Sequence, residues 1–172
     1  MQLVSPLTID DCERLPDELA INHELEDGKL VDVSGDIANH HSLRDELIMM
    51  LLPYVTKHEL GRVVCGQDYD FGGNALGPDL SFFGPEKLKL CQGNLRVQRF
   101  VPDLTIEIVS DSEPFSRLVK KANWYRKFGT KEAWILDIDA RKAFLFSEEH
   151  EAFQSSLIPG FSIRIGDLFD QL

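Results

Sequence analysis

Apolar and polar residues follow two different periods along the chain, and this pattern predicts both strands and helices. Alternation around Asp27-Gly28, a dipeptide typical of tight turns, predicts a β-hairpin over residues 21–33. Apolar residues three or four positions apart predict a long helix over residues 38–60, which Gly61 would end. The next expected elements are strands at residues 62–71 and 79–83 and a loop at residues 84–100.

The second half of the chain predicts a strand–helix–strand unit. Residues 104–110 are rich in Ile, Val and Thr, as strands are. Residues 113–128 have the pattern of an amphipathic helix, and residues 132–138 again indicate a strand. Such units usually form a crossover between parallel strands, so we expect a mixed α/β fold. Further short elements are expected at residues 142–147, 153–157 and 165–168.

Length and composition indicate one ordered domain over residues 1–172. This length can bury a proper core, and a hydrophobic fraction of 43% argues against disorder. Cys12, Cys65 and Cys91 are far apart and odd in number, which predicts no disulfide framework and favours a reducing compartment. The first residues lack the pattern of a signal peptide, and the longest apolar run, residues 48–52, is too short to span a membrane. We therefore expect a cytoplasmic protein that has no membrane partner.

Charge is distributed unevenly along the chain. The net charge of −11 is unfavourable for a partner rich in phosphate. Residues 86–142 nevertheless carry 12 basic and 8 acidic residues, whereas residues 1–85 carry 5 basic and 16 acidic residues. This fits a local face for an anionic substrate on an otherwise acidic body. An ordinary solvated helix and loop would explain the same distribution equally well.

Two carboxylates on predicted strands could form a metal site. Glu107 lies within an apolar run, where a carboxylate is costly to bury unless something offsets its charge. Because side chains alternate along a strand, Glu107 should point away from Ile106 and Ile108. If the strand after Asp79 lies alongside, the two carboxylates and the backbone carbonyl of Ile108 would form an oxygen-rich site suited to Mg²⁺. Such an ion lowers the pKa of a bound water and stabilises charge on a phosphate.

Lys121 is the candidate for a catalytic lysine. It lies four residues before Tyr125 on the predicted helix and flanks the apolar stripe, so its amine could reach the end of the strand. There it could orient or deprotonate the attacking water. Lys120 points about 100° away, toward solvent or phosphate. A purely structural interpretation also holds, in which Asp79 starts a strand, Glu107 lies at a sheet edge and Lys121 lies at the surface.

Several motifs in chain order resemble the large bacterial family of putative restriction endonucleases of unknown function, a branch of the PD-(D/E)xK nuclease superfamily. The similarity covers most of the chain, and the order of the motifs makes the set specific although each is weak alone. The family's Lys-x-x-x-Tyr-x-x-x-Gly motif, for example, is matched by Lys121, Tyr125 and Gly129. The other matching segments are residues 23–30, His40, and residues 78–82, 102–110, 132–137, 159–161 and 167–169.

The resemblance implies a restriction-endonuclease-like fold, in which a central mixed sheet is flanked by helices and preceded by an N-terminal hairpin. It also implies that Asp79 and Glu107 bind the metal and that Lys121 is the catalytic lysine. Mg²⁺ or Mn²⁺ would be the cofactor, and nucleic acid, first of all DNA, would be the partner. In the standard superfamily motif the lysine comes two residues after the acid, where this chain has Val109, so the lysine has moved to the helix.

Two positions depart from the family pattern. Arg117 stands where the family usually has an acid four residues before the helix lysine. Ser110-Asp111-Ser112 replaces a serine-proline-serine turn. Both departures leave the three central residues intact, and we expect Arg117 and Lys120 to contact the substrate.

Three further residues are expected to support the site, namely Glu24, His40 and Tyr125. Glu24 either faces the site, as a supporting residue or an extra ligand, or belongs to the polar face of the hairpin. His40 fits a hydrogen-bonding role better than metal ligation, because the adjacent His41 gives no zinc-site spacing. Asp103 shares the face of Glu107 but lies about 13 Å along the strand, so it is not assigned to the metal.

Two functional hypotheses follow from these residues. The first is a magnesium-dependent endonuclease that hydrolyses DNA through Asp79, Glu107 and Lys121. Cutting both strands requires two active sites, so a homodimer is plausible. The second is a nuclease fold that serves as a binding or assembly module without turnover, which the acidic body and the lack of a separate DNA-reading motif favour.

Overall fold

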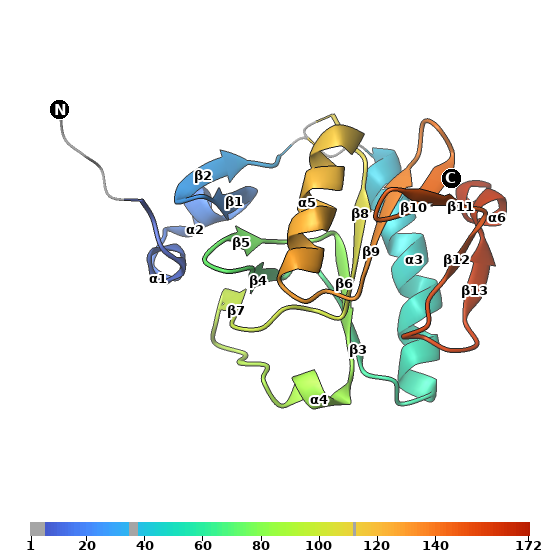
Figure 1. Cartoon of the computed structure of the whole chain (residues 1–172), viewed down its shortest axis with the longest axis horizontal. Helices are drawn as coiled ribbons and strands as arrows, with labels where there is room; N and C mark the ends of the chain where they lie inside the picture. The colour runs from blue at the N-terminus through green and yellow to red at the C-terminus, as the bar shows by residue number, and fades with distance from the viewer. Residues whose placement is uncertain (1–5, 35–37, 112) are drawn as a thin grey trace.

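The computed structural model describes residues 6–34, 38–111 and 113–172, and a six-stranded sheet lies at its centre (Figure 1). Strands β8 and β9 are parallel, and the other neighbouring strands of this sheet are antiparallel. In spatial order the strands are β11 (Glu148–His150), β10 (Lys142–Leu145), β9 (Glu132–Asp137), β8 (Leu104–Ile108), β6 (Leu80–Phe83) and β3 (Arg62–Cys65).

Helix α5 (Phe115–Lys127) connects the two parallel strands β8 and β9. The strand–helix–strand unit predicted from the sequence is therefore present. In its register Glu107 of β8 lies opposite Ile135 of β9. The unit fixes where α5 runs relative to the end of β8, and so where the side chains of the helix meet the sheet.

The two faces of the central sheet pack against different helices. Leu104, Ile106 and Ile108 of β8 pack into the cluster that contains the buried residues of α3 (Ala38–Lys57). The helix α6 (Ile165–Phe169) and the hairpin of β12 (Ala152–Gln154) and β13 (Ser162–Arg164) contribute to the same cluster. The opposite face packs against α5, through Leu118, Ala122 and Tyr125. Glu107 therefore points away from the core residues of its own strand, as the alternation predicted.

A second sheet of five strands lies beside α5 (Figure 1). At the turn of its N-terminal hairpin, Asp27 and Gly28 have φ angles of 47° and 77°, in the left-handed region that such tight turns require. The predicted hairpin is thus confirmed. In spatial order the strands are β2 (Lys29–Asp32), β1 (His23–Glu26), β5 (Ala75–Leu76), β4 (Asp68–Asp70) and β7 (Val97–Gln98).

Some predicted element boundaries are wrong. The expected strand over residues 62–71 is broken at Gly66, which has a φ of 60°, so that β3 and β4 belong to different sheets. The long helix runs unbroken through Pro53 but ends at Lys57 rather than at residue 60. The expected loop at residues 84–100 contains β7 and the short helix α4 (Pro85–Leu88). Two more short helices precede the hairpin, α1 (Ile9–Cys12) and α2 (Asp17–Ala20).

The described residues can be examined for membrane-spanning helices and for disulfide bonds. Among the helices in the described ranges, none has the length and apolar character that a membrane crossing requires. Cys12, Cys65 and Cys91 are free thiols in the structure.

The core beneath α3 gives a stability prediction. Leu47 is fully buried in the cluster against the central sheet, whereas Met49 on the same helix is 59% exposed. Leu47→Ala should lower the free energy of unfolding by about 2–5 kcal/mol, because it removes buried apolar surface and leaves a cavity. Met49→Ala should change it by less than about 0.5 kcal/mol. Urea unfolding of the two variants measures the difference, and equal losses would contradict this assignment of the core.

Candidate active site

Asp79 and Glu107 come from neighbouring strands. β6 pairs antiparallel with β8, with Leu80 opposite Ile106, and Asp79 immediately precedes β6. Asp79 Oδ2 accepts a hydrogen bond of 2.8 Å from the backbone N–H of Ile108, which fixes the aspartate beside the end of β8. The negative charge of Asp79 contributes to the environment of the Glu107 carboxylate. The structure therefore brings together the two carboxylates that the sequence singled out.

Lys121 is buried between three carboxylates rather than exposed. Its side chain is 2% exposed, and its Nζ lies 2.9 Å from Glu24 Oε1, 3.1 Å from Glu107 Oε1 and 3.0 Å from Glu113 Oε1. The helix places it there because Ala122 and its buried neighbours dock α5 on the sheet. We call Lys121, Glu24, Glu107 and Glu113 the lysine cluster. The purely structural interpretation, which placed Lys121 at the surface, is therefore wrong for this residue.

Glu107 has one bonded and one unbonded oxygen. Its Oε1 accepts a short hydrogen bond from the Tyr125 hydroxyl and pairs with Lys121. Its Oε2 is buried and has no hydrogen-bond partner among the described residues. Burial raises the pKa of Glu107 well above its usual range, against the opposing charge of Lys121. A buried carboxylate oxygen without a partner is costly, which makes it a natural position for a cation.

The charge balance keeps Lys121 protonated. Burial alone would lower the pKa of its amine, but the carboxylates of Glu107 and Glu24 raise that pKa well above the usual value. One ammonium group cannot fully compensate three carboxylates. Burial, reinforced by the charge of Glu113, raises the pKa of Glu24 against the opposing charge of Lys121. The lysine cluster thus combines a lysine whose ammonium form is favoured with surplus negative charge.

Glu24 reaches the site from the hairpin and is held at two points. Besides pairing with Lys121, its Oε1 accepts a hydrogen bond of 2.8 Å from the backbone N–H of Gly77. A Cβ on residue 77 would lie 2.4 Å from Asp68 Oδ1, so a larger residue here would require the Asp68 carboxylate to shift. Of the two interpretations of Glu24, the structure supports the one in which it faces the site.

Arg117 connects the hairpin to the start of α5. Its guanidinium forms a short ion pair with Glu26, lies 3.5 Å from Glu24 Oε2 and donates to Glu113 Oε1 at 3.1 Å. Arg117, which stands where the family usually has an acid, therefore neutralises carboxylates around Lys121. Its expected contact with substrate stays a prediction.

His40 and Tyr125 support the two carboxylates. His40 is buried, and its Nε2 lies 3.2 Å from Asp79 Oδ1, in line with the expected hydrogen-bonding role. Tyr125 is also buried and donates to Glu107, as described above. Lys120 of α5, in contrast, is exposed.

Asp103 is not part of the site. It pairs with Lys87 at 2.9 Å and Lys131 at 3.1 Å and accepts a hydrogen bond from Gly84 N–H at 2.9 Å. Its role is to hold the segments around the other end of β8. This position agrees with the strand spacing, from which Asp103 was not expected to bind the metal.

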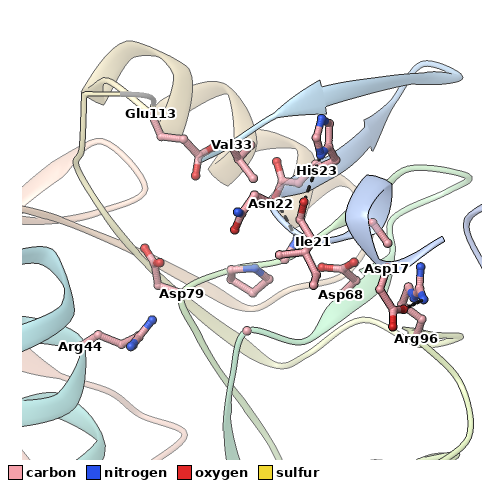
Figure 2. Close-up of a pocket in the computed structure, with 15 residues that line it drawn as sticks. Asp17, Ile21, Asn22, His23, Val33, Arg44, Asp68, Asp79, Arg96 and Glu113 are labelled. Atoms are coloured by element: carbon pink, nitrogen blue, oxygen red, sulfur yellow. Dashed lines mark hydrogen bonds and ion pairs between the residues drawn. The ribbon is translucent and has the colours of Figure 1, made fainter. Parts of the chain in front are cut away.

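A pocket of about 430 Å³ opens beside Asp79. Figure 2 shows the carboxylates of Asp79 and Glu113 turned toward the same space, which Arg44 also lines. Glu24 and Asp68 also line the pocket. Burial, reinforced by the charge of Glu24, raises the pKa of Asp68 to about 7. The pocket is therefore rich in negative charge next to the two candidate metal ligands.

Sequence reasoning missed Glu113 and Asp68. Glu113 stands four residues before Arg117, a spacing that favours an ion pair on a helix, so this pair had a local signal. Asp68 had none, because its position depends on the break at Gly66 and on the close approach of Gly77.

The residues fit a hard cation that keeps much of its water. Among the described residues, no three His, Cys, Asp or Glu side chains gather closely enough to hold a metal ion together. Two carboxylates on adjacent strands, one with an unbonded buried oxygen, nevertheless match Mg²⁺, which is commonly bound through one or two carboxylates and several waters. They do not match a four-ligand zinc site.

Comparison with solved structures defines the class of fold. The chain superimposes with a TM-score of 0.83 on the crystal structure of a putative nuclease belonging to DUF820 from Anabaena variabilis ATCC 29413. The two are 24% identical, and the match covers 96% of this chain and 99% of that one. The predicted fold class, a mixed sheet flanked by helices, is thereby confirmed.

Residues 9–169 match the sequence model of the Uma2 family, described as "Putative restriction endonuclease". The chain belongs to this family, and the resemblance found in its motifs is confirmed. No curated protein sequence matches the chain at a significant level.

The raised pKa of Asp68 gives a prediction for stability against pH. Its pKa is about 7 in the folded protein against 3.8 ordinarily, so the folded state binds more protons between these values and loses stability as the pH rises through them. Asp68→Asn removes this loss. The variant should therefore become progressively more stable than the native protein as the pH rises from 4 to 7. Urea unfolding at several pH values measures the difference. Asp139→Asn, on an exposed turn, is the control for losing one negative charge, and parallel curves for both variants would contradict the prediction.

Proposed function

We propose that this protein is a metal-dependent nuclease that hydrolyses phosphodiester bonds in DNA, with Asp79, Glu107 and Lys121 in its active site. The observation that carries the proposal is the convergence of three charged groups from separate segments. Asp79 is fixed to the end of β8, and Lys121 contacts Glu107 on that strand. Membership in the Uma2 family and the nuclease fold support the same function.

Mg²⁺ or Mn²⁺ would be held by Asp79, Glu107 and the backbone carbonyl of Ile108. When bound, such an ion lowers the pKa of a water and stabilises negative charge on a phosphate. Substrate binding would require the ion, because the pocket beside Asp79 contains more acidic than basic side chains and would otherwise repel a phosphate.

The protonation state of Lys121 defines its part in the reaction. Its raised pKa favours the ammonium form, which can donate hydrogen bonds to a phosphate oxygen and to the attacking water. The same raised pKa disfavours Lys121 as the base that takes a proton from that water. Tyr125 and His40 orient Glu107 and Asp79 through the contacts described above.

A second candidate function is a nuclease fold that binds without turnover. Two observations favour it: Arg117 replaces the acid usual in the family, and Glu113 pairs with the lysine that catalysis would use. Calorimetric titration with Mg²⁺ and Mn²⁺ separates the two functions, because the absence of metal binding would favour the module without turnover.

The proposed roles predict selective losses of cleavage. Asp79→Asn, Glu107→Gln and Lys121→Met should each lower the rate of plasmid cleavage in Mg²⁺ or Mn²⁺ by at least about 100-fold, because each removes a ligand or a stabilising charge. Lys57→Met, an exposed lysine on α3, should cleave at the native rate. Near-ultraviolet circular dichroism of each variant checks that it is folded. Native activity in folded Lys121→Met protein would refute the catalytic role of the lysine.

The proposed metal site predicts stabilisation by the ion. Mg²⁺ or Mn²⁺ at 100 times its dissociation constant should stabilise the native protein by about 2.7 kcal/mol, because the ion binds the folded state only. Glu107→Gln should abolish most of this increase while preserving the shape of the side chain. Thermal unfolding with and without the ion measures it. An equal increase in the variant would place the ion elsewhere.

A further inference from the structure

The outer face of α5 carries a second pocket. It has a volume of about 590 Å³ and is lined by Arg117, Lys120, Lys121 and Trp124, with Ser116 and Asn123 of the same helix. Glu26 of β1 also lines it, and its carboxylate is paired with Arg117. The pocket beside Asp79 is lined by Glu24 and Glu113, so the lysine cluster forms a wall of both pockets. We call the second pocket the α5 groove.

The α5 groove lies in the most basic part of the chain. Residues 114–131 contain six basic residues and no acidic residue, in a protein with a net charge of −11. Lys120 and Lys127 are exposed, and neither forms an ion pair with a described residue. Arg117 and Lys121, in contrast, are fully engaged with carboxylates. The positive charges of Lys120 and Lys127 are therefore available to a partner. The net charge of −11 already keeps the protein soluble, so solubility does not explain these two lysines.

Trp124 lies between these two lysines on the same helical face. It follows Lys120 by four residues and precedes Lys127 by three, spacings that place all three side chains together. The indole is partly exposed and lines the α5 groove. Lys127 Nζ lies 5.3 Å from the centroid of the Phe128 ring, a contact that leaves its charge uncompensated. An aromatic ring flanked by ammonium groups that pair with no carboxylate is the arrangement that proteins use for single-stranded nucleic acids, in which bases stack on the ring and phosphates pair with the cations. A base in an intact duplex has no free face for such stacking.

We infer that the α5 groove binds a single-stranded segment of nucleic acid, with a base against Trp124 and phosphates near Lys120 and Lys127. This rests on the proposed function in one respect, because the segment would belong to the substrate whose cleavage site lies on the other side of the lysine cluster. It adds a preference for substrates with an unpaired region beside the scissile bond.

Tryptophan fluorescence tests the inference directly, because the chain has two tryptophans and Trp134 is 1% exposed. An oligothymidine of about twelve nucleotides, added in EDTA at low salt, should quench the fluorescence of the native protein. Trp124→Ala should lose most of the affinity, with affinity measured from the anisotropy of a labelled oligothymidine, whereas Trp124→Phe, which keeps an aromatic face, should retain much of it. Lys120→Gln and Lys127→Gln should each weaken binding and reduce the slope of log K against log salt by about 0.7. Lys57→Gln, another exposed and unpaired helical lysine in the described chain, should bind as the native protein does.

Three results would overturn the inference. The first is unchanged oligothymidine affinity in Trp124→Ala. The second is equal quenching by a duplex, which would mean that no base stacks on the ring. The third is equal quenching by polyglutamate, which would make the groove a general surface for anions. The test is independent of catalysis: quenching without cleavage in any metal would refute the proposed nuclease and leave the groove, whereas cleavage without quenching would refute the groove alone.

Discussion

The contact between the buried ammonium of Lys121 and three carboxylates is the interaction on which the site depends. Charges of this kind are costly to bury and persist only when they are paired and hydrogen-bonded. Glu24 belongs to the hairpin, Glu107 to the central sheet and Glu113 to the segment before α5, so one amine joins three parts of the molecule. Burial raises the pKa of Glu107 and Glu24, and the neighbouring carboxylates raise it further. This surplus of negative charge favours the binding of a cation.

The fold determines this contact through two simple periodicities. Alternation along β8 places Ile106 in the core beneath α3 and Glu107 on the side of α5. The helical period places Ala122 and Tyr125 on the sheet, and Lys121 lies at the edge of that stripe where β8 ends. The parallel crossover between β8 and β9 then holds α5 in a position from which both conditions are met.

Much of the fold and part of the site could be predicted from the sequence, and the failures have physical causes. The hairpin at Asp27-Gly28 and the β8–α5–β9 unit have strong local patterns. β5 and β7 have only two residues each and exist because neighbouring strands pair with them, so no local pattern marks them. The burial of Lys121 was missed because it depends on Glu24, which lies 97 residues away in the sequence.

A crystal structure with Mn²⁺, located by its anomalous scattering, shows whether Asp79 and Glu107 bind the same ion. We expect an anomalous peak within about 2–2.5 Å of one carboxylate oxygen of Asp79 and one of Glu107. Lys121 should remain in contact with the site. A peak elsewhere, or none between these two side chains in crystals saturated with Mn²⁺, would contradict the account.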